Sequence, residues 1–363
     1  MWRKGAKYVG YVALWVVIAV VVLWAEGRTN DHADSTTISN LRVDVKHSND
    51  HKLIDGRAME SWIANKGLSP IGTTLAKADI ANLESVVSTH TAVAIANVYT
   101  TYDGEVAIEI AQHEPIARLR FDGYDNYVTA DGQILRAAES YSVPVTVVTG
   151  GYKPLYGRNF AGNVRDVVAD SLAKLDSYIA ELESEKIPYY EKLQENSKEL
   201  RLVLNQRIRK SLFMDDDAYQ ILRNDLKRRK SEARNRHRYR RQELEAGIVA
   251  LERRQEEARR KKQLLQREAD DFFAMVDFLN YVSRNRYWSA EIVQIMASGG
   301  RGKAIELSFV PRSGRFTVDL GTTEDTHRKL ATLTRFYEKG LNNIGWDKYR
   351  NISLRYRGQV VCK

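Results

Sequence analysis

Apolar and polar residues alternate with two different periods along residues 41–111, and these periods predict a small domain of helices and strands. A period of two, as in Leu-Arg-Val-Asp-Val at 41–45, is typical of a half-buried strand, whereas apolar residues three and four positions apart are typical of an amphipathic helix. Asp103-Gly104 lies between two apolar runs and predicts a tight hairpin. The predicted elements are, in order, a strand at 41–45, helices at 55–65 and 79–89, and strands at 92–101 and 105–111.

A second region of alternating sequence predicts a β-rich domain, so that the chain as a whole belongs to the α+β class. Residues 189–270 interrupt this region and show no strand pattern. The glycine-rich stretch at 298–303 is interpreted as a hairpin loop. The predicted elements are a hairpin at 127–134, a strand at 143–150, a helix at 163–183, strands at 292–296, 304–311 and 315–320, a helix at 324–340 and a last strand at 351–361.

The longest apolar run, residues 8–25, contains no charged residue and predicts one transmembrane helix. At about 1.5 Å per helical residue it spans roughly the 30 Å of a bilayer core. Arg3, Lys4 and Lys7 precede it, so the positive-inside rule predicts a cytoplasmic N-terminus and an extracytoplasmic bulk, at the inner (plasma) membrane. A cleaved signal peptide is the alternative, but residues 23–25 lack the small-x-small cleavage pattern. The residues expected within the bilayer include Val12, Leu14, Trp15, Ile18, Val22 and Leu23.

Almost all of the net charge of +9 comes from a single segment. Residues 189–270 hold 23 Lys and Arg against 15 Asp and Glu, and contain Gly247 as their only glycine. This composition predicts long helices or a coiled coil. Apolar residues at helical spacing in both halves predict two helices folded back on each other; they are Leu193, Leu200, Leu204, Ile208 and Leu212, and then Leu244, Ile248, Leu251, Ala258 and Leu265.

Basic clusters within this segment, at 227–230 and 234–241, would suggest nucleic-acid binding in a cytosolic protein. The predicted topology argues against nucleic acid as a partner, so most of these charges are interpreted as a solvated helix face. Anionic lipid headgroups, or an acidic polymer or protein, remain as alternative partners of the basic helices.

The order β-α-α-β-β directly after a predicted membrane anchor is typical of a POTRA domain. The sequence Ile-Glu-Ile-Ala-Gln-His-Glu-Pro-Ile-Ala at 108–117 resembles the junction between the POTRA and β domains of the bacterial cell-division family FtsQ (DivIB). Residues 127–134, 143–150 and 336–363 are also similar to that family, so that the resemblance covers roughly three quarters of the chain and leaves out the basic segment. It implies a non-catalytic scaffold of the divisome that links early and late division proteins at the septum.

The resemblance also implies that the last strand and the helix before it recruit the small coiled-coil division proteins FtsB and FtsL. A last strand often lies at a sheet edge, where an extended segment of another chain can add to it. The alternative is a strand that pairs only within the protein. The POTRA domain is expected to contact other divisome components, and its strand at 105–111 is a candidate edge. The candidate partner-binding residues are Tyr337, Tyr349, Ile352, Ser353, Leu354, Arg355, Tyr356, Gln359 and Val360.

No catalytic, cofactor-binding or metal-binding site is predicted, and the protein is predicted not to be an enzyme. The seven histidines are scattered, and the sequence contains no H-E-x-x-H, G-x-S-x-G or P-loop motif. Cys362 is the single cysteine, which excludes an intramolecular disulfide. Two other classes lack support: a POTRA-type assembly or secretion factor would need further repeats or a barrel, and an envelope hydrolase would need a cluster of acids, bases or metal ligands.

The predicted organisation follows from these observations. It comprises a cytoplasmic tail at 1–7, the transmembrane helix at 8–25, a linker at 26–40, a POTRA domain at 41–115, the first part of the β domain at 116–188, a basic helical insertion at 189–270, and the second part of the β domain at 271–363.

Overall fold

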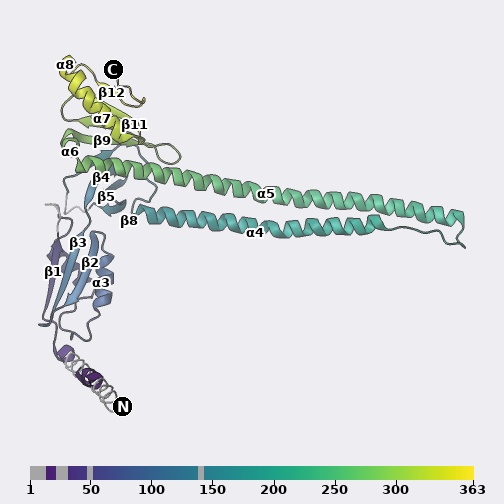
Figure 1. Ribbon diagram of the computed structural model, residues 1–363, viewed down its shortest axis with the longest axis horizontal. Helices are drawn as coiled ribbons and strands as arrows, with labels where there is room; N and C mark the ends of the chain where they lie inside the picture. The colour runs from purple at the N-terminus through teal and green to yellow at the C-terminus, as the bar shows by residue number, and fades with distance from the viewer. Residues whose placement is uncertain (1–13, 22–31, 47–51, 138–142) are drawn as a thin grey trace, which may run out of the picture. The chain divides into compact units, whose positions relative to one another are not determined.

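A computed structural model describes residues 14–21, 32–46, 52–137 and 143–363 (Figure 1). The chain divides into two compact units. The first contains the described residues up to Asn163 together with 274–299 and 305–363, and the second contains 164–273 and 300–304.

The predicted transmembrane segment lies largely outside the described residues. Leu14, Trp15 and Ile18 belong to a short described helix, 14–21, with exposed side chains, whereas Val12, Val22 and Leu23 are not described. Across the described ranges, no helix combines the length and the apolar character that crossing a bilayer requires. The membrane anchor therefore stays a prediction.

The first unit contains a three-stranded sheet with two helices, in the predicted order β-α-α-β-β. Its sheet order is β1-β3-β2, with β3 parallel to β1 and antiparallel to β2. The prediction that the strand at 105–111 forms an edge is wrong, because β1 pairs along its full length and makes it the central strand. Parallel pairing across a helical crossover cannot be read from local periodicity. The elements are β1 (Asn40–Lys46), α2 (Gly56–Asn65), α3 (Ile80–Ser88), β2 (Val93–Thr100) and β3 (Glu105–Gln112).

The two helices cover this sheet because each carries one apolar stripe. Met59 and Ile63 of α2 and Leu83 and Val87 of α3 are buried in the same core as Ile108 of β3. These pairs are four residues apart and so lie on one helix face. The Asp79 carboxylate caps α3 by accepting a 3.0 Å hydrogen bond from the main-chain N–H of Asn82, as expected at a helix start.

The first unit also contains a ten-stranded sheet in the order β13-β12-β11-β10-β9-β7-β4-β5-β6-β8. Its centre is β7, which pairs in parallel with both β4 and β9. Val148 of β7 lies opposite Leu119 and Ile295, and all three side chains are fully buried. This pairing joins the chain before and after the long helices, so the sheet is continuous across a gap of more than a hundred residues in sequence.

The predicted hairpin at 127–134 corresponds to β5 and β6, and the predicted strands at 143–150, 292–296, 304–311 and 315–320 correspond to β7, β9, β10 and β11. β4, β8 and α6 were not predicted, and the elements near the C-terminus differ from the prediction. The strands are β4 (Pro115–Phe121), β5 (Tyr124–Thr129), β6 (Gln133–Arg136), β7 (Thr146–Thr149), β8 (Gly162–Asn163), β9 (Ile292–Ser298), β10 (Glu306–Pro311), β11 (Thr317–Thr322), β12 (Asn351–Ser353) and β13 (Val361–Cys362), and the helices are α6 (Arg286–Glu291), α7 (Thr326–Phe336), the π-helical turn η1 (Tyr337–Leu341) and α8 (Asn342–Ile344).

The second unit is a hairpin of two long helices, α4 (Val164–Asn205) and α5 (Asp216–Arg284), except that residues 274–284 of α5 belong to the first unit. The hairpin confirms the prediction that the basic segment folds back on itself (Figure 1). Contacts between the two helices run in opposite senses along the sequence. Lys186 Nζ donates to Gln255 Oε1 over 2.8 Å, and Asn196 Nδ2 donates to the His237 carbonyl over 2.9 Å. The helices are therefore antiparallel. The predicted helix at 163–183 and the insertion expected from residue 189 form one continuous helix, because Pro188 does not end α4.

Gly247 lies in the middle of α5 because it faces an aromatic ring on α4. A Cβ atom at this position would overlap the ring of Tyr189. Glycine inside a helix costs about 1 kcal/mol relative to alanine, so its presence here reflects the close approach of the two helices.

Gly247→Ala is therefore expected to give none of the stabilisation that this exchange gives in an unobstructed helix. In a Tyr189→Ala background, the same exchange should raise the free energy of unfolding by about 1 kcal/mol. Urea unfolding followed by far-UV circular dichroism measures both values. An equal gain in the two backgrounds would show that Tyr189 does not impose the glycine.

His90 is expected to make the first sheet acid-sensitive. Burial lowers the pKa of His90 below its usual 6.5, its ring packs edge-on against Trp62 at 5.0 Å, and its Nδ1 accepts a hydrogen bond from the Ala92 N–H. As the pH falls, the unfolded state therefore binds a proton at this histidine before the folded state does. The stability that neutral His90 contributes is fully present above about pH 6.5 and is lost as the pH falls toward the lower pKa of the folded state. His90→Asn, which keeps an acceptor, should flatten this dependence in urea titrations at several pH values; an unchanged slope would contradict the assignment.

Candidate partner-binding site

The C-terminal residues form a short hairpin, and the prediction of one continuous strand at 351–361 is wrong. The chain pairs with β11 as β12, reverses, and returns as β13, with Ile352 opposite Cys362. The reversal contains a hydrogen bond from the Gln359 N–H to the Tyr356 carbonyl. Gly358 has a φ of 74°, a left-handed conformation that glycine adopts without strain. This single glycine converts the expected strand into a turn.

β13 is the last strand of the sheet and leaves one set of main-chain groups on an open edge. Asn351 and Lys363 exchange two hydrogen bonds, of 3.1 and 2.9 Å. In an antiparallel pair the bonded residues alternate, so the N–H and C=O of Cys362 point away from β12. These groups lie where an added strand would pair.

Arg355 ties the hairpin to the rest of the sheet. Its Nε donates to Asp319 of β11 over 2.6 Å, and its two terminal nitrogens donate to both carboxylate oxygens of Glu306 on β10 over 2.9 and 2.7 Å. These hydrogen bonds raise the pKa of Arg355 well above its ordinary value. A guanidinium suits this role because its fork of donors matches two carboxylates at once. Arg355, expected to contact a partner, is thus engaged within the protein.

Gly321 allows the Arg355 side chain to cross β11. Gly321 has a φ of 69°, and a Cβ atom there would lie 2.8 Å from Cγ of Arg355. Its N–H donates to the second oxygen of Asp319 over 3.0 Å, which fixes the carboxylate that receives Arg355.

Several predicted contact residues are buried, so their side chains do not face a partner. Tyr337 is only 3% exposed and packs against Phe316 and Trp346 at centroid distances of 6.1 and 5.0 Å. Burial raises the pKa of Tyr337. It continues the apolar stripe of α7 and faces the core, so the side chain of this candidate partner-binding residue is enclosed within the protein. Ile352 and Leu354 are buried in the same way, and Ser353 and Tyr349 are half-buried.

The remaining predicted residues border a groove of about 270 Å³ between the start of α7 and the C-terminal turn. Tyr356, which is 61% exposed, and Gln359 line it, and Val360 lies half-buried beside the turn. Four cations and two acids surround the groove, and one of the cations, Arg355, is already paired with Glu306 and Asp319. The remaining surplus of one positive charge suits an extended segment with negative charge. The four cations are Arg328, Lys329, Arg355 and Arg357, and the two acids are Glu324 and Asp325.

The polar face of α7 is the part of this groove that sequence reasoning missed. Lys329 Nζ donates to the Thr322 carbonyl over 2.8 Å, and burial lowers the pKa of Lys329. The sequence does show this face, because charged residues recur at helical spacing opposite Leu330 and Leu333. A polar helix face is usually only solvated, so this pattern alone does not indicate a binding site.

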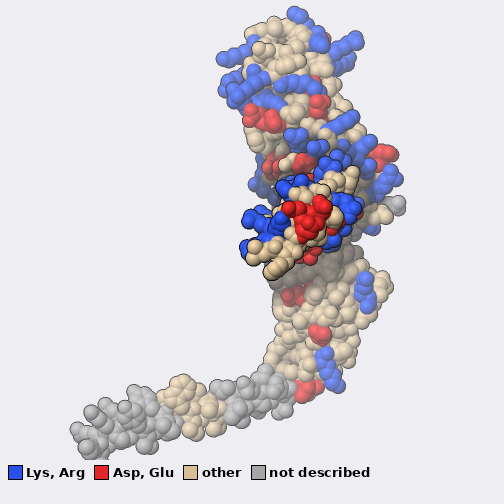
Figure 2. All heavy atoms as spheres, turned by 90° about the vertical axis from the view of Figure 1, so that its right-hand side faces the viewer, with Lys and Arg blue, Asp and Glu red and all other residues tan. Residues whose placement is uncertain are grey.

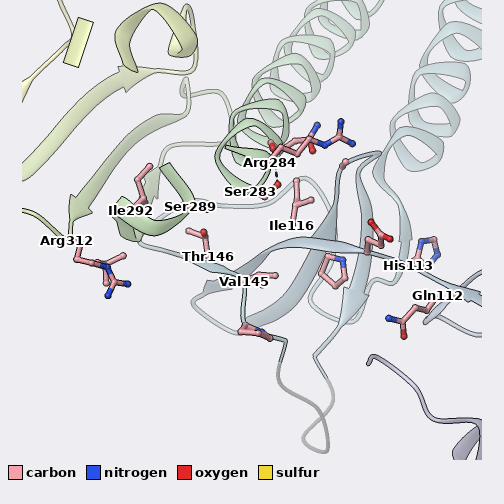
Figure 3. A pocket seen from close by; sticks show the side chains of 16 residues that line it. Gln112, His113, Ile116, Val145, Thr146, Ser283, Arg284, Ser289, Ile292 and Arg312 are labelled. Atoms are coloured by element: carbon pink, nitrogen blue, oxygen red, sulfur yellow. Dashed lines mark hydrogen bonds between the residues drawn. The ribbon is translucent and has the colours of Figure 1, made fainter. Parts of the chain in front are cut away.

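A second cavity, of about 520 Å³, lies where β3 continues into β4 (Figure 3). The predicted junction sequence forms one wall, with His113 and Ile116, and Figure 3 shows Ser283 and Arg284 on another segment that borders it. Burial lowers the pKa of His113. Its lining mixes scattered polar and apolar groups and shows no arrangement typical of catalysis.

The described residues around these sites form no cluster of side chains suited to metal binding or to catalysis. Within the part of the chain that the structure describes, no group of three or more His, Cys, Asp or Glu side chains could hold a metal ion. The Cys362 thiol is half-buried, and burial raises its pKa, which disfavours the reactive thiolate.

Comparison with known families agrees with this architecture. Residues 36–111 match the POTRA-like domain, and residues 260–363 match the FtsQ/DivIB, C-terminal related domain. No curated protein matches the chain. The order of the two matches defines the class: a POTRA-like domain followed by an FtsQ-like β domain, within a mixed α+β fold. These two matches support the FtsQ/DivIB family, the family that the sequence resembles.

Arg355→Lys should loosen the C-terminal hairpin, because a lysine cannot make the forked contact with Glu306. The loss of this partly exposed ion pair is expected to cost about 1 kcal/mol, or roughly fivefold in the opening of β13. Cys362 is the only cysteine, so its rate of alkylation by a maleimide reports that opening. The control is Arg357→Lys, at an exposed position, which should leave the rate unchanged. Equal rates in both variants would remove Arg355 from this role.

Proposed function

We propose that this protein is a non-catalytic scaffold of bacterial cell division that recruits FtsB- and FtsL-like coiled-coil proteins by strand addition at β13. The carrying observation is the open edge of β13, where the N–H and C=O of Cys362 point away from β12; the turn that connects these two strands borders the groove at the start of α7. The family relationship supports a divisome role, since the FtsQ/DivIB C-terminal related domain contains this edge.

Strand addition would take its affinity from main-chain hydrogen bonds and its specificity from the groove. Each such bond contributes about 0.5–1.5 kcal/mol, so two or three of them need support from side-chain contacts. Tyr356 and Gln359 provide exposed contacts, and the surplus of cations over acids in the groove favours acidic residues in the incoming segment.

The location in the envelope is part of the same proposal. The apolar residues 8–25 would anchor the chain in the inner membrane with the N-terminus in the cytoplasm, and both domains would then lie outside the cytoplasm, at the septum. The POTRA-like domain would contact other divisome components, with β1 and β2 as its sheet edges.

Cys362→Pro is the most selective test of the edge. It removes an N–H that points away from β12, and leaves the hydrogen bonds between Asn351 and Lys363 in place. Capture of the organism's own FtsB–FtsL-like pair by the full chain should fall roughly tenfold, about 1.4 kcal/mol.

Cys362→Ala is the matched control, because it changes the side chain and keeps the N–H. It should capture the pair as the unaltered chain does. Undiminished capture by the proline variant would exclude strand addition at β13 and move the site to another surface.

A further inference from the structure

The connection between α4 and α5 presents two large apolar side chains entirely to solvent. Leu212 is 98% exposed and Phe213 is 99% exposed. Three more apolar residues near this end of the hairpin are exposed as well, namely Leu202, Ile221 and Leu222. Large apolar side chains gathered on one exposed surface commonly mark a contact with another molecule.

The connection is held in place at both of its ends. On one side, Lys230 Nζ donates to the carbonyls of Leu204 and Gln206, over 2.7 Å in each case. On the other, the Lys210 ammonium forms an ion pair with Asp216 at the start of α5. Between them, the Met214 N–H donates to the Ser211 carbonyl over 3.1 Å, which makes a turn around Leu212 and Phe213. The two side chains thus lie at the tip of a supported turn.

The positive charge of the insertion is concentrated in the half of the hairpin that carries this tip. Residues 195–241 contain 15 Lys and Arg against 7 Asp and Glu, whereas the rest of 189–270 contains 8 of each. Figure 2 looks onto this end of the hairpin and shows Lys and Arg gathered around a compact acidic group. The surplus of eight cations therefore lies entirely in the half of the hairpin that carries the tip.

Cations on one flank of α5 are free to meet an external anion. Arg223, Lys227 and Arg234 are spaced by four and seven residues and so lie on the same side of the helix. None of them takes part in an ion pair among the described residues. The acids of the tip are offset internally, since Asp216 pairs with Lys210 and the Asp215–Asp217 triplet lies at the positive end of the helix dipole.

We propose that this tip docks on an anionic phospholipid surface, with Leu212 and Phe213 entering the acyl region and the flanking cations meeting headgroup phosphates. An apolar tip with a cationic collar has the arrangement of interfacial membrane anchors. A narrow, convex turn offers little area for a protein interface, which usually buries about 800 Å² on each partner, whereas a bilayer deforms around it. This inference does not depend on the proposed role of β13.

Flotation of the full chain with lipid vesicles tests the proposal. The chain is held in nanodiscs of phosphatidylcholine, so that its apolar N-terminal segment is already in lipid, and is mixed with vesicles of phosphatidylcholine alone or in equal parts with phosphatidylglycerol. Flotation is expected only with the anionic vesicles, and should weaken as salt is added.

Leu212→Ser combined with Phe213→Ser should lower flotation with anionic vesicles roughly tenfold. Both side chains are fully exposed, so the fold is not at risk, and circular dichroism checks the helix content. The matched control replaces Ile187 and Tyr190 by serine, an exposed apolar pair of α4 outside the positively charged residues 195–241, and should float normally. Arg223→Glu with Arg234→Glu should also reduce flotation.

Three results would overturn the proposal. Equal flotation of the Leu212 and Phe213 variant and the unaltered chain would leave charge alone as the cause. Equal flotation with neutral vesicles would exclude anionic headgroups. Absence of flotation with either vesicle would leave an acidic protein as the occupant of the tip.

Discussion

The forked contact of Arg355 with Glu306 and Asp319 is the constraint on which the C-terminal edge depends. β12 has three residues and β13 has two, so the strands themselves supply few hydrogen bonds. A charged fork that reaches across two neighbouring strands fixes the hairpin while leaving the outer side of β13 unpaired. Gly321 makes the approach possible, since any side chain there would meet Arg355. The position of β13 is thus fixed by side chains of the neighbouring strands, and the side of β13 that faces away from β12 stays unpaired.

The insertion obeys a different constraint, which is the close packing of α4 against α5. Polar contacts such as Lys186 with Gln255 and Asn196 with His237 lie buried among aliphatic side chains and fix the antiparallel register. The close contact between Gly247 and the ring of Tyr189 requires the same register for steric reasons. With the core of the hairpin defined in this way, its surface is free to carry charge. The ten-stranded sheet does not need the hairpin for its continuity, because β7 pairs directly with β9.

Local sequence signals predicted the elements that depend on local physics. The period-two and helical patterns gave the first sheet and its helices, and Asp103-Gly104 gave the hairpin between β2 and β3. The charge pattern of residues 189–270 gave the two helices. The predicted cytoplasmic tail and anchor lie largely outside the described ranges. The predicted linker at 26–40 is described from residue 32 onward, and Ile38 within it is buried in the core of the first sheet.

The features that could not be predicted depend on contacts distant in sequence. Arg355 was a candidate contact because Leu354-Arg355-Tyr356 resembles the family pattern. Its carboxylate partners are 36 and 49 residues away, so no local pattern shows that it is engaged within the protein. Tyr337 could have faced either solvent or core, and only the packing of Phe316 and Trp346 decides it. β13 is too short to show a period, and the turn at Gly358 that creates it depends on one backbone angle.

Hydrogen–deuterium exchange of the full chain, with and without its FtsB–FtsL-like pair, tests the central claim most directly. Strand addition would protect the amide of Cys362 and slow exchange across the C-terminal hairpin and the start of α7, because the outward N–H becomes hydrogen-bonded. Protection confined to the POTRA-like domain or to the helical hairpin, with unchanged exchange at Cys362, would contradict the account.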